Sequence, residues 1–319
     1  MALIPFRFFP NRPNFKIVPL RRAAYMLSLA AIVGSILIAL GVGLNLGIDF
    51  RGGSLIEARF QQPPSISDLR EKVANLNIGE VTIQEFGEPR DILIRVQRQE
   101  GDKEDQTAAI ESVKSSLGDG VEIRRTEFIG PTVGEELKKA GAIAVLLSML
   151  GIVAYIWFRF EWQFAVAGVL ALSHDVIITI GLFAVTGWEF NLSTVAALLT
   201  IAGYSINDTV VVFDRVRENL RKYKQETLLT LLNRSINDTL SRTVMTSVTT
   251  LLALLALAIF GGEVIRSFTY ALIWGIAIGT YSSIFVAACL LLQMRDVRNT
   301  RPTPTPGSDE AEALPSGSA

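Results

Sequence analysis

Six long apolar runs divide the chain, and each is close to the length that crosses a membrane. A helix needs about 20 mostly apolar residues to span the hydrocarbon layer. The runs cover residues 24–44, 140–158, 164–186, 192–213, 243–260 and 267–293. The first run is too long for a signal peptide and is preceded by a 23-residue segment, so we expect it to be retained. The pattern therefore predicts an α-helical polytopic membrane protein with six transmembrane helices.

The interval between the first two runs, residues 45–138, has the shorter periodicities of a soluble domain. Alternating apolar positions predict strands at 54–60, 80–86, 91–97 and 121–128, and helical spacing predicts helices at 66–76 and 106–117. Gly87-Glu88-Pro89 separates the middle strands, and Ser67 is the expected cap of the first helix. The order β-α-β-β-α-β predicts a ferredoxin-like α+β domain, an antiparallel four-stranded sheet covered on one face by two helices.

The distribution of charge predicts the orientation in the membrane. Residues 1–23 carry five Lys or Arg and no acid, and residues 214–242 carry seven basic and four acidic side chains. Because basic segments stay in the cytoplasm, both should lie there, together with the C-terminus and its Arg295, Arg298 and Arg301. The domain at 45–138, with 12 basic and 18 acidic residues, should then be periplasmic.

These expectations divide the chain into five parts. They are a cytoplasmic segment at 1–23, a first helix at 24–44, the periplasmic domain at 45–138, helices 2 to 6 at 139–294 with a basic cytoplasmic loop at 214–242, and a tail at 295–319. The tail is rich in Pro, Ser, Gly and Thr, a composition typical of disorder.

Composition narrows the chemistry. Half of the residues are hydrophobic and the mean hydropathy is +0.37, a surplus that requires lipid. The single cysteine, Cys289, excludes an internal disulfide framework and a Cys-rich metal site. No G-x-x-x-x-G-K-[ST] phosphate loop is present, so energy from ATP would have to come from a partner. We expect no metal, no cofactor and no nucleic-acid partner.

Ionisable residues inside the apolar runs are the candidate site, because each is costly in lipid. Asp208 should lie about 9 Å from the cytoplasmic end of the fourth helix, and Arg242 opens the fifth helix at the same end, so the two can meet. Hydroxyl groups at helical spacing accompany them on the fifth helix. The polar residues expected to support the pair are Tyr204, Ser205, Asn207, Thr243, Thr246, Ser247 and Thr250, with a further cluster at 280–283.

Such an arrangement is suited to proton movement. Burial disfavours the charged carboxylate, whereas a nearby arginine favours it. If the helix carrying Asp208 alternates between Arg242 and a watery crevice, the carboxylate takes up a proton on one side and releases it on the other. One charge crossing 100 mV is worth about 2.3 kcal/mol, enough to bias a domain movement of a few kcal/mol. His174 and Asp175, midway along the third helix, are further candidates for this proton relay.

Structural interpretations remain open for each residue. Asp208 alone fits a hydrogen bond between helices, and Arg242 alone fits an anchor to lipid phosphate. His174 and Asp175 point about 100° apart on a helix, so they cannot share one site without help from other spans. The small residues Gly275, Gly279, Ser283 and Ala287 predict close packing against another helix.

Three motifs resemble those of the SecD/SecF family, in particular its SecF-type members, within the resistance-nodulation-division transporter superfamily. The first, just after the first span, is Gly47-Ile48-Asp49-Phe50-Arg51-Gly52-Gly53. The second, in the fourth span, runs from Gly203 to Thr209 and continues from Val212 to Asn219. The third, Ser241-Arg242-Thr243 with Met245-Thr246-Ser247, opens the fifth span, and residues 172–175 resemble the third-span pattern. The resemblance implies that Asp208 and Arg242 are the family's intramembrane acid and arginine.

The family's function then follows as an expectation. The chain should be a non-enzymatic subunit of the bacterial inner-membrane export machinery that uses the proton gradient in late translocation steps. The implied partners are SecD, the SecYEG channel, the exported unfolded polypeptide and membrane lipid, with YajC as a further candidate. Six spans are half of the twelve used by that superfamily, which also implies a partner.

Other classes of function stay open on the residues alone. Asp175 and Asp208 on neighbouring spans would suit an intramembrane aspartyl protease, although the Gly-x-Gly-Asp motif is absent at Asp208. A proton-coupled half-transporter for small molecules or lipids would share the fold. A scaffold without transport activity would tolerate substitution of Asp208.

Overall fold

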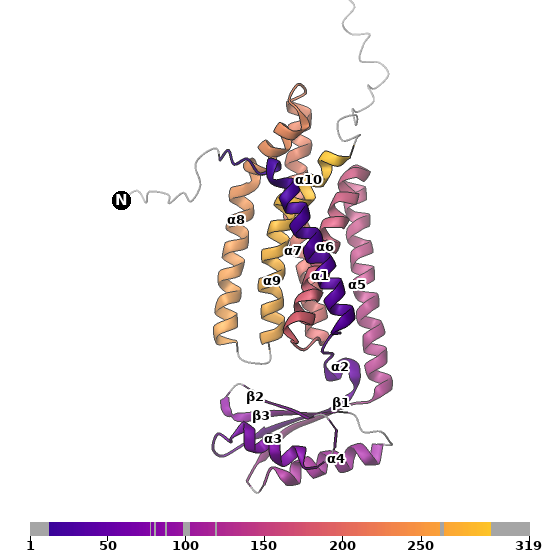
Figure 1. The fold of residues 1–319 in the computed structure, drawn as a ribbon, viewed down its shortest axis with the longest axis vertical. Coiled ribbons are helices and arrows are strands. Elements are labelled where there is room, and N and C mark those ends of the chain that lie inside the picture. Colours follow the sequence, from indigo (N-terminus) through magenta and orange to yellow (C-terminus); the bar gives the residue numbers. More distant parts are fainter. Residues whose placement is uncertain are drawn as a thin grey trace, which may run out of the picture.

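The computed structural model describes residues 13–76, 78–79, 81–86, 88–97, 103–118, 120–261 and 265–294. Within these residues, six helical runs are long and apolar enough to cross a membrane, with mean hydropathy between 1.6 and 2.2. They form one bundle, and an α/β domain lies beyond one end of it (Figure 1). The six predicted spans are thereby confirmed. The tail predicted at 295–319, with its three arginines, lies outside the described residues.

The long helices define the bundle. They are α1 (Arg21–Gly41), α5 (Pro131–Arg159), α6 (Trp162–Thr186), α7 (Leu192–Lys222), α8 (Leu228–Phe260) and α9 (Arg266–Ser282). A short 3-10 turn, Val18–Leu20, precedes α1. The last span continues from α9 through a π-helical turn, Ser283–Ala287, into α10 (Ala288–Leu290) and a 3-10 turn, Leu291–Gln293. π-turns are rare and occur often at functional sites.

Three spans form the centre of the bundle and three its periphery. In the most apolar windows of α6, α7 and the last span, 61%, 50% and 61% of residues are buried, against 11%, 11% and 17% for α1, α5 and α8. The exposed apolar faces of the outer helices suit hydrocarbon, which imposes no cost on them. Close packing in the centre uses glycine, as predicted: a Cβ on Gly279 would lie 3.1 Å from Cβ of Ser205 on α7.

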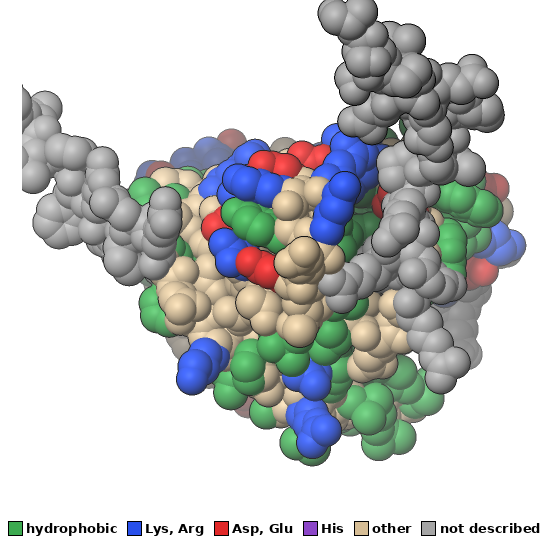
Figure 2. All heavy atoms as spheres, turned by 90° about the horizontal axis from the view of Figure 1, so that it is seen from above, with side chains coloured by type: hydrophobic (Ala, Val, Ile, Leu, Met, Phe, Trp, Pro, Cys, Tyr) green, Lys and Arg blue, Asp and Glu red, His purple; other side chains and the backbone are tan. Residues whose placement is uncertain are grey.

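The polar segment 214–242 differs from its prediction as a loop. It is mostly helical, because α7 continues to Lys222 and α8 already begins at Leu228. The two polar extensions form a hairpin, joined by the ion pair between Arg215 and Asp238 at 2.8 Å. Figure 2 looks down on this end and shows Lys, Arg, Asp and Glu side chains gathered there. Hydropathy marks where a helix leaves the apolar layer, and these helices extend beyond that point.

The α/β domain has the predicted ferredoxin-like topology. It consists of β1 (Gly53–Arg59), α3 (Ile66–Ala74), β2 (Val81–Phe86), β3 (Glu88–Gln97), α4 (Lys103–Ser116) and β4 (Glu122–Ile129). The strands are antiparallel in the order β2-β3-β1-β4. One face of the sheet packs on α3 and α4 through side chains such as Ile56, Ile94 and Val113, all fully buried.

Two local predictions in this domain need correction. The cap of α3 is Ser65, not Ser67, because the Ser65 hydroxyl accepts a hydrogen bond from the backbone N–H of Asp68 at 3.4 Å. β3 begins at Glu88 rather than at Asp91, so Pro89 lies in the first residues of the strand. Proline is tolerated near the start of a strand, where a ladder hydrogen bond can be omitted. Gly87 lies outside the described residues.

Candidate functional site

Asp208 lies in the middle of the bundle on α7. It is the sixteenth residue after Leu192, the start of α7, which places it about 24 Å along the helix axis from the end near the α/β domain. The residue is only 3% exposed. Its Oδ1 accepts a long hydrogen bond from the Thr243 hydroxyl at 3.5 Å, and its Oδ2 has no hydrogen-bond partner among the described residues. A buried acid with so few donors is costly, which marks it as a functional candidate.

Arg242 does not pair with Asp208 in this structure, although the sequence led us to expect that the two can meet. Arg242 directly precedes Thr243 on α8, but its side chain is exposed and forms no ion pair with any described residue. Adjacent helical residues point about 100° apart, so Thr243 faces Asp208 while Arg242 faces away from the centre of the bundle. The structure therefore places Arg242 next to Thr243, the residue that contacts Asp208, but Arg242 itself does not contact Asp208.

The predicted hydroxyl stripe on α8 does join neighbouring helices. Ser247 is 2.6 Å from the Thr280 hydroxyl of α9, and Thr250 is 3.3 Å from the Tyr204 hydroxyl of α7. Thr246 instead donates to backbone carbonyls of its own helix, those of Arg242 and Thr243. Asn207, expected to support Asp208, is exposed on α7 and lies outside this cluster.

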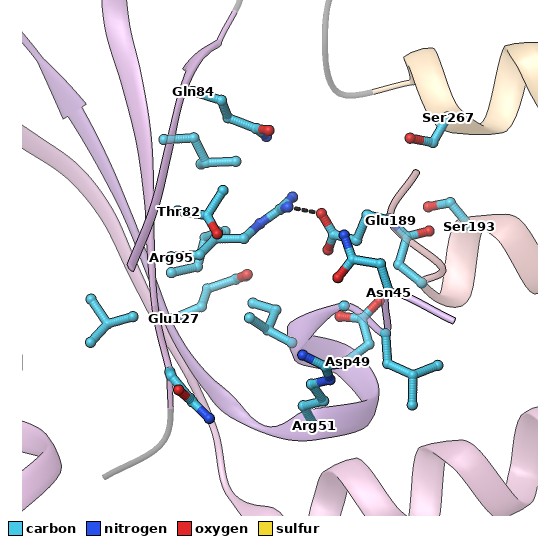
Figure 3. Close-up of a pocket in the computed structure, with 18 of the residues that line it drawn as sticks. Asn45, Asp49, Arg51, Thr82, Gln84, Arg95, Glu127, Glu189, Ser193 and Ser267 are labelled. Carbon is cyan, nitrogen blue, oxygen red and sulfur yellow. Dashed lines mark ion pairs between the residues drawn. The ribbon is translucent and has the colours of Figure 1, made fainter. Parts of the chain in front are cut away.

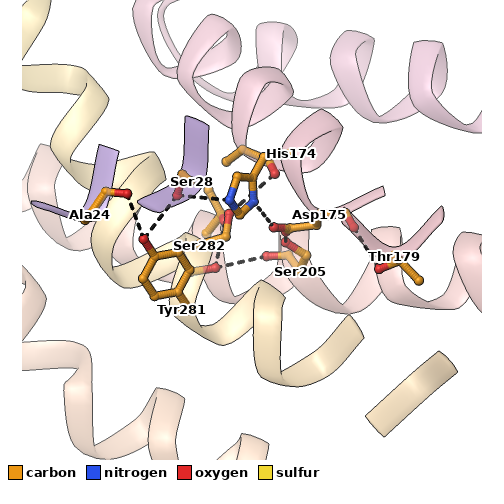
Figure 4. Close-up of polar contacts among 11 residues, drawn as sticks. Ala24, Ser28, His174, Asp175, Thr179, Ser205, Tyr281 and Ser282 are labelled. Carbon is orange, nitrogen blue, oxygen red and sulfur yellow. Dashed lines mark hydrogen bonds and ion pairs between the residues drawn. The ribbon is translucent and has the colours of Figure 1, made fainter. Parts of the chain in front are cut away.

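His174 and Asp175 belong to a second polar cluster, on α6 (Figure 4). The sequence indicated that adjacent residues need other spans to share a site, and three spans supply that help. Nδ1 of His174 lies 2.8 Å from Oδ1 of Asp175, and the Ser205 hydroxyl of α7 donates to Oδ2 of Asp175 at 2.5 Å. On the other side of the ring, Nε2 lies 3.1 Å from the Ser28 hydroxyl of α1.

The cluster extends to the last span through Tyr281. The Tyr281 ring stacks on His174, with centroids 6.1 Å apart, and its hydroxyl lies 3.1 Å from that of Ser28. The same hydroxyl donates to the backbone carbonyl of Ala24 at 3.0 Å. Sequence reasoning missed Ser28 entirely. The available signal was weak, because the first run contains three hydroxyl side chains, Tyr25, Ser28 and Ser35.

The glycine-rich motif at residues 47–53 connects the bundle to the α/β domain. Asp49, in the short helix α2 (Ile48–Arg51), accepts a hydrogen bond from the Leu192 backbone N–H at 2.9 Å, so it caps the first turn of α7. Gly52 and Gly53 have φ of 75° and 132°, which only glycine adopts readily. Phe50 is buried and packs on Phe190. The motif therefore anchors the start of the helix that carries Asp208.

A polar cleft of about 630 Å³ lies between the open face of the sheet and the adjoining ends of the helices (Figure 3). Arg95 of β3 and Glu189, just before α7, form an ion pair across it. Asp49, Arg51, Glu127 and Ser267 also line the cleft. No group of three or more His, Cys, Asp or Glu side chains that could hold a metal ion occurs among the described residues.

Comparisons with known proteins match this arrangement. A family model described as "Protein export membrane protein SecD/SecF, C-terminal" matches residues 109–297, and one described as "SecD/SecF GG Motif" matches residues 38–64. The protein translocase subunit SecF of Rickettsia rickettsii is 46% identical over 298 residues, covering 91% of this chain and 95% of the relative. The subunit of the same name from Desulfurispirillum indicum is 45% identical, covering 89% and 94%.

Two solved structures are also similar. The crystal structure of SecDF, a translocon-associated membrane protein from Thermus thermophilus, matches with a TM-score of 0.79 and 37% identity, over 90% of this chain and 39% of that chain. SecDF in its super-membrane-facing form matches with a TM-score of 0.69, over 92% and 40%. The present chain thus spans about two fifths of the length of the SecDF chains.

Proposed function

The chain belongs to the SecD/SecF family of protein-export membrane proteins, as a SecF-type translocase subunit, and from this premise we propose that it couples proton movement to protein export. In this proposal Asp208 is the group that takes up and releases the proton. The Sec machinery moves unfolded polypeptides across the bacterial inner membrane, and the chain contributes to late steps of that movement. As a member of this family it is a transport component, not an enzyme.

The observation that carries the proposal is the environment of Asp208. A carboxylate in the centre of a membrane bundle, with one long hydrogen bond and one oxygen without a partner, is poorly stabilised as an anion. Protonation removes the charge, and a movement that brings a cation or water to Asp208 restores it. Arg242, exposed one residue from Thr243, is the nearest candidate for that cation. Alternation between these two environments would transfer one proton in each cycle.

His174 and Asp175 extend the proposed relay. Ser205, which donates to Asp175, lies three residues before Asp208 on α7, so one helix contacts both clusters. A movement of α7 would therefore change the surroundings of Asp175 and Asp208 at the same time. Because a charge crossing 100 mV is worth about 2.3 kcal/mol, one proton suffices to bias such a movement.

A stripe of small and polar residues on α7 supports assembly with a SecD subunit. It consists of exposed residues at helical spacing: Ser193, Ala196, Thr200, Gly203 and Asn207. Polar side chains that face lipid find no hydrogen-bond partners there, so the polar members of the stripe favour a protein neighbour. The small members let a second helix approach closely. The SecDF structures, of which this chain matches two fifths, contain the additional chain length that such a partner would supply.

The remaining partners and the orientation follow from the proposed role. The SecD and SecF pair would act beside the SecYEG channel on the emerging polypeptide, with YajC as a further candidate. Both chain ends would be cytoplasmic, because the polar hairpin and the described N-terminal residues lie at the same end of the bundle (Figure 1). The α/β domain would then lie in the periplasm.

The other functional classes have less support. Asp175 and Asp208 share no hydrogen bond, since Asp175 is engaged by His174 and Ser205 and Asp208 by Thr243, whereas an aspartyl protease needs two acids around one water. A half-transporter for small molecules would need a route through the bundle. The cleft lined by Asp49, Arg95 and Glu189 lies between the α/β domain and the helix ends, not within the bundle.

Export of a secreted reporter tests the proposal, in cells whose only copy of the chain carries Asp208→Asn. Asparagine keeps the size of the side chain but cannot bind and release a proton at neutral pH. We expect export to fall at least tenfold while the chain still assembles with its partner. Asp214→Asn is the matched control, because Asp214 is an exposed acid on the same helix, paired with Arg159, and should retain export. Normal export by the Asp208→Asn chain would contradict the proposal and favour a scaffold.

A further inference from the structure

The cluster around His174 constrains the number of protons it holds. Three contacts follow one another from the ring: His174 Nε2 to Ser28 at 3.1 Å, Ser28 to Tyr281 at 3.1 Å, and Tyr281 to the carbonyl of Ala24 at 3.0 Å. Each contact needs one hydrogen, and the two hydroxyl groups supply only two. The carbonyl cannot donate. The third hydrogen must therefore come from Nε2 of His174.

The other side of the ring sets a second condition. Nδ1 faces Oδ1 of Asp175 at 2.8 Å, and a hydrogen must lie between them, since a bare nitrogen and a carboxylate oxygen would repel. Ser205 occupies the other carboxylate oxygen as a donor. Two arrangements satisfy both conditions, an imidazolium beside a carboxylate or an imidazole beside a carboxylic acid. Both hold one proton more than neutral histidine beside ionised aspartate, and both leave the buried pair without net charge.

The partners of this cluster attach α1 to the rest of the bundle. Only two residues of α1 are buried, Ala24 and Ser28, and they are the two that Tyr281 and His174 contact. The other residues of α1 are exposed or half-buried, and a second close contact packs Ser35 of α1 on Gly181 of α6. After α1 the chain passes through α2 into β1, a central strand of the sheet that lies between β3 and β4. The attachment of α1 thus affects the helix from which the α/β domain continues.

We infer that the His174–Asp175 pair is a second proton-binding site, separate from Asp208, whose proton fastens α1 to the bundle. When the proton leaves, one of the three contacts has no hydrogen and the pair becomes a buried anion. Both changes weaken the hydrogen bonds that link Tyr281 and His174 to α1. The role of this release in export rests on the proposed function, whereas the proton count and the attachment of α1 do not.

No other titratable side chain contacts the pair among the described residues. Within their apolar runs, the helices packed against α6 carry Tyr25, Tyr155, Tyr204, Asp208, Tyr270 and Cys289, together with Tyr281. Of these, Tyr281 alone contacts His174, by its ring and through Ser28. The proton count of the cluster is therefore set by His174, Asp175, Ser28, Ser205 and Tyr281.

Because His174 is the single histidine of the chain, nitrogen NMR can test the inference directly. The full chain, labelled with 15N-histidine and placed in lipid nanodiscs, gives one pair of ring signals. We expect a protonated Nε2 at pH 7, in either of the two allowed arrangements. An unprotonated Nε2 at pH 7, with only Nδ1 carrying hydrogen, would overturn the inference.

Two variants on α9 test whether the network imposes this state. In Tyr281→Phe the Ser28 hydroxyl is free to donate to Nε2, so a larger share of the Nε2 signal should shift to the unprotonated position at pH 7. Tyr270→Phe, on the same helix and in contact with Trp188, should leave the signal unchanged. Identical spectra for Tyr281→Phe and the unmodified chain would show that hydrogen counting does not control the pair.

The attachment of α1 has its own readout. A spin label on Met26→Cys, exposed on α1, should gain mobility when the pH is raised until the Nε2 signal changes. A label on Leu150→Cys, exposed on α5, should not respond, and Ser28→Ala should free the α1 label already at pH 7. An α1 label that is insensitive to both changes would overturn the attachment. Export measured with Asp208→Asn decides the proposed function separately, because that substitution leaves this cluster intact.

Discussion

Two acids lie in the centre of the bundle, and their surroundings differ sharply. Asp175 is fully buried and both of its oxygens are engaged, one by His174 at 2.8 Å and the other by Ser205 at 2.5 Å. Asp208 is almost as buried, but it has one donor at 3.5 Å and one oxygen without a partner among the described residues. A network in which every polar group has a hydrogen-bond partner stabilises one arrangement of helices. An acid without such partners is stabilised by a movement that brings partners to it.

The difference assigns separate roles to the two clusters. The Asp175 cluster draws on α1, α6, α7 and the last span, so it holds the bundle together in the present conformation (Figure 4). Among the described residues, Asp208 itself has one side-chain hydrogen bond, to Thr243 of α8, and the exposed Arg242 directly precedes Thr243. Replacing Asp175 should therefore destabilise the bundle more than replacing Asp208 does.

The largest effect on stability is expected for Asp175→Ala. This change leaves His174 and Ser205 without their acceptor in the core, and breaking a buried polar pair typically costs about 3 kcal/mol. Asp208→Ala removes a poorly satisfied carboxylate and should cost less than about 1 kcal/mol. Reversible unfolding of both variants in mixed micelles, compared with the unmodified chain, gives the two values. Equal losses of stability would mean that hydrogen bonds stabilise the two acids to the same extent, contrary to the structure.

A smaller difference should distinguish the two hydroxyl donors. Ser205→Ala removes the short hydrogen bond to Asp175 and should cost about 1 kcal/mol, within the range of hydrogen bonds between membrane helices. Thr243→Val removes the long bond to Asp208 while keeping the shape of the side chain, and should change stability by no more than a few tenths of a kcal/mol. The same unfolding assay measures both. A larger loss for Thr243→Val would show that Asp208 relies on Thr243 after all.

The smallest effect is expected in the α/β domain, where the buried Asp91 pairs with an arginine. In the α/β domain Asp91 forms hydrogen bonds with Arg59 at 2.5 and 2.6 Å, which lower the pKa of the Asp91 carboxyl below its usual value. A folded-state pKa that is lowered adds stability above the unfolded pKa, and this stability disappears as the pH falls through the folded pKa. The melting temperature of the α/β domain should therefore fall slightly in acid. Asp91→Asn should reduce that decline, and an unchanged pH dependence in the variant would contradict the assignment.

The sequence predicted the architecture because lengths and periods determine it. Apolar runs indicate spans by their length, and the alternation around Leu55 and Glu57 indicates a strand with one buried face. Local chemistry at helix ends is harder to predict: the sequence indicated Ser67 as the cap of α3, whereas the backbone places Ser65 in that role. Charge predicts a loop at 214–242 because it shows where the apolar layer ends, not where a helix ends.

The candidate site could be predicted only in part. The cost of a charge in lipid pointed to Asp208, His174, Asp175 and Arg242 without any structure. Their contacts depend on side-chain directions and on which helices pack together. For that reason the contact of Ser28 with His174, the stacking of Tyr281 and the outward direction of Arg242 could not be inferred from spacing.

Proton permeation tests the central claim most directly, namely that Asp208 carries the transferred proton. The chain would be purified with its SecD-type partner, placed in vesicles under an imposed pH gradient, and compared with the same complex carrying Asp208→Asn, with Asp214→Asn as the control. The account predicts proton movement through the unmodified and the Asp214→Asn complexes and none above background through the Asp208→Asn complex. Equal proton movement through the Asp208→Asn complex would contradict it.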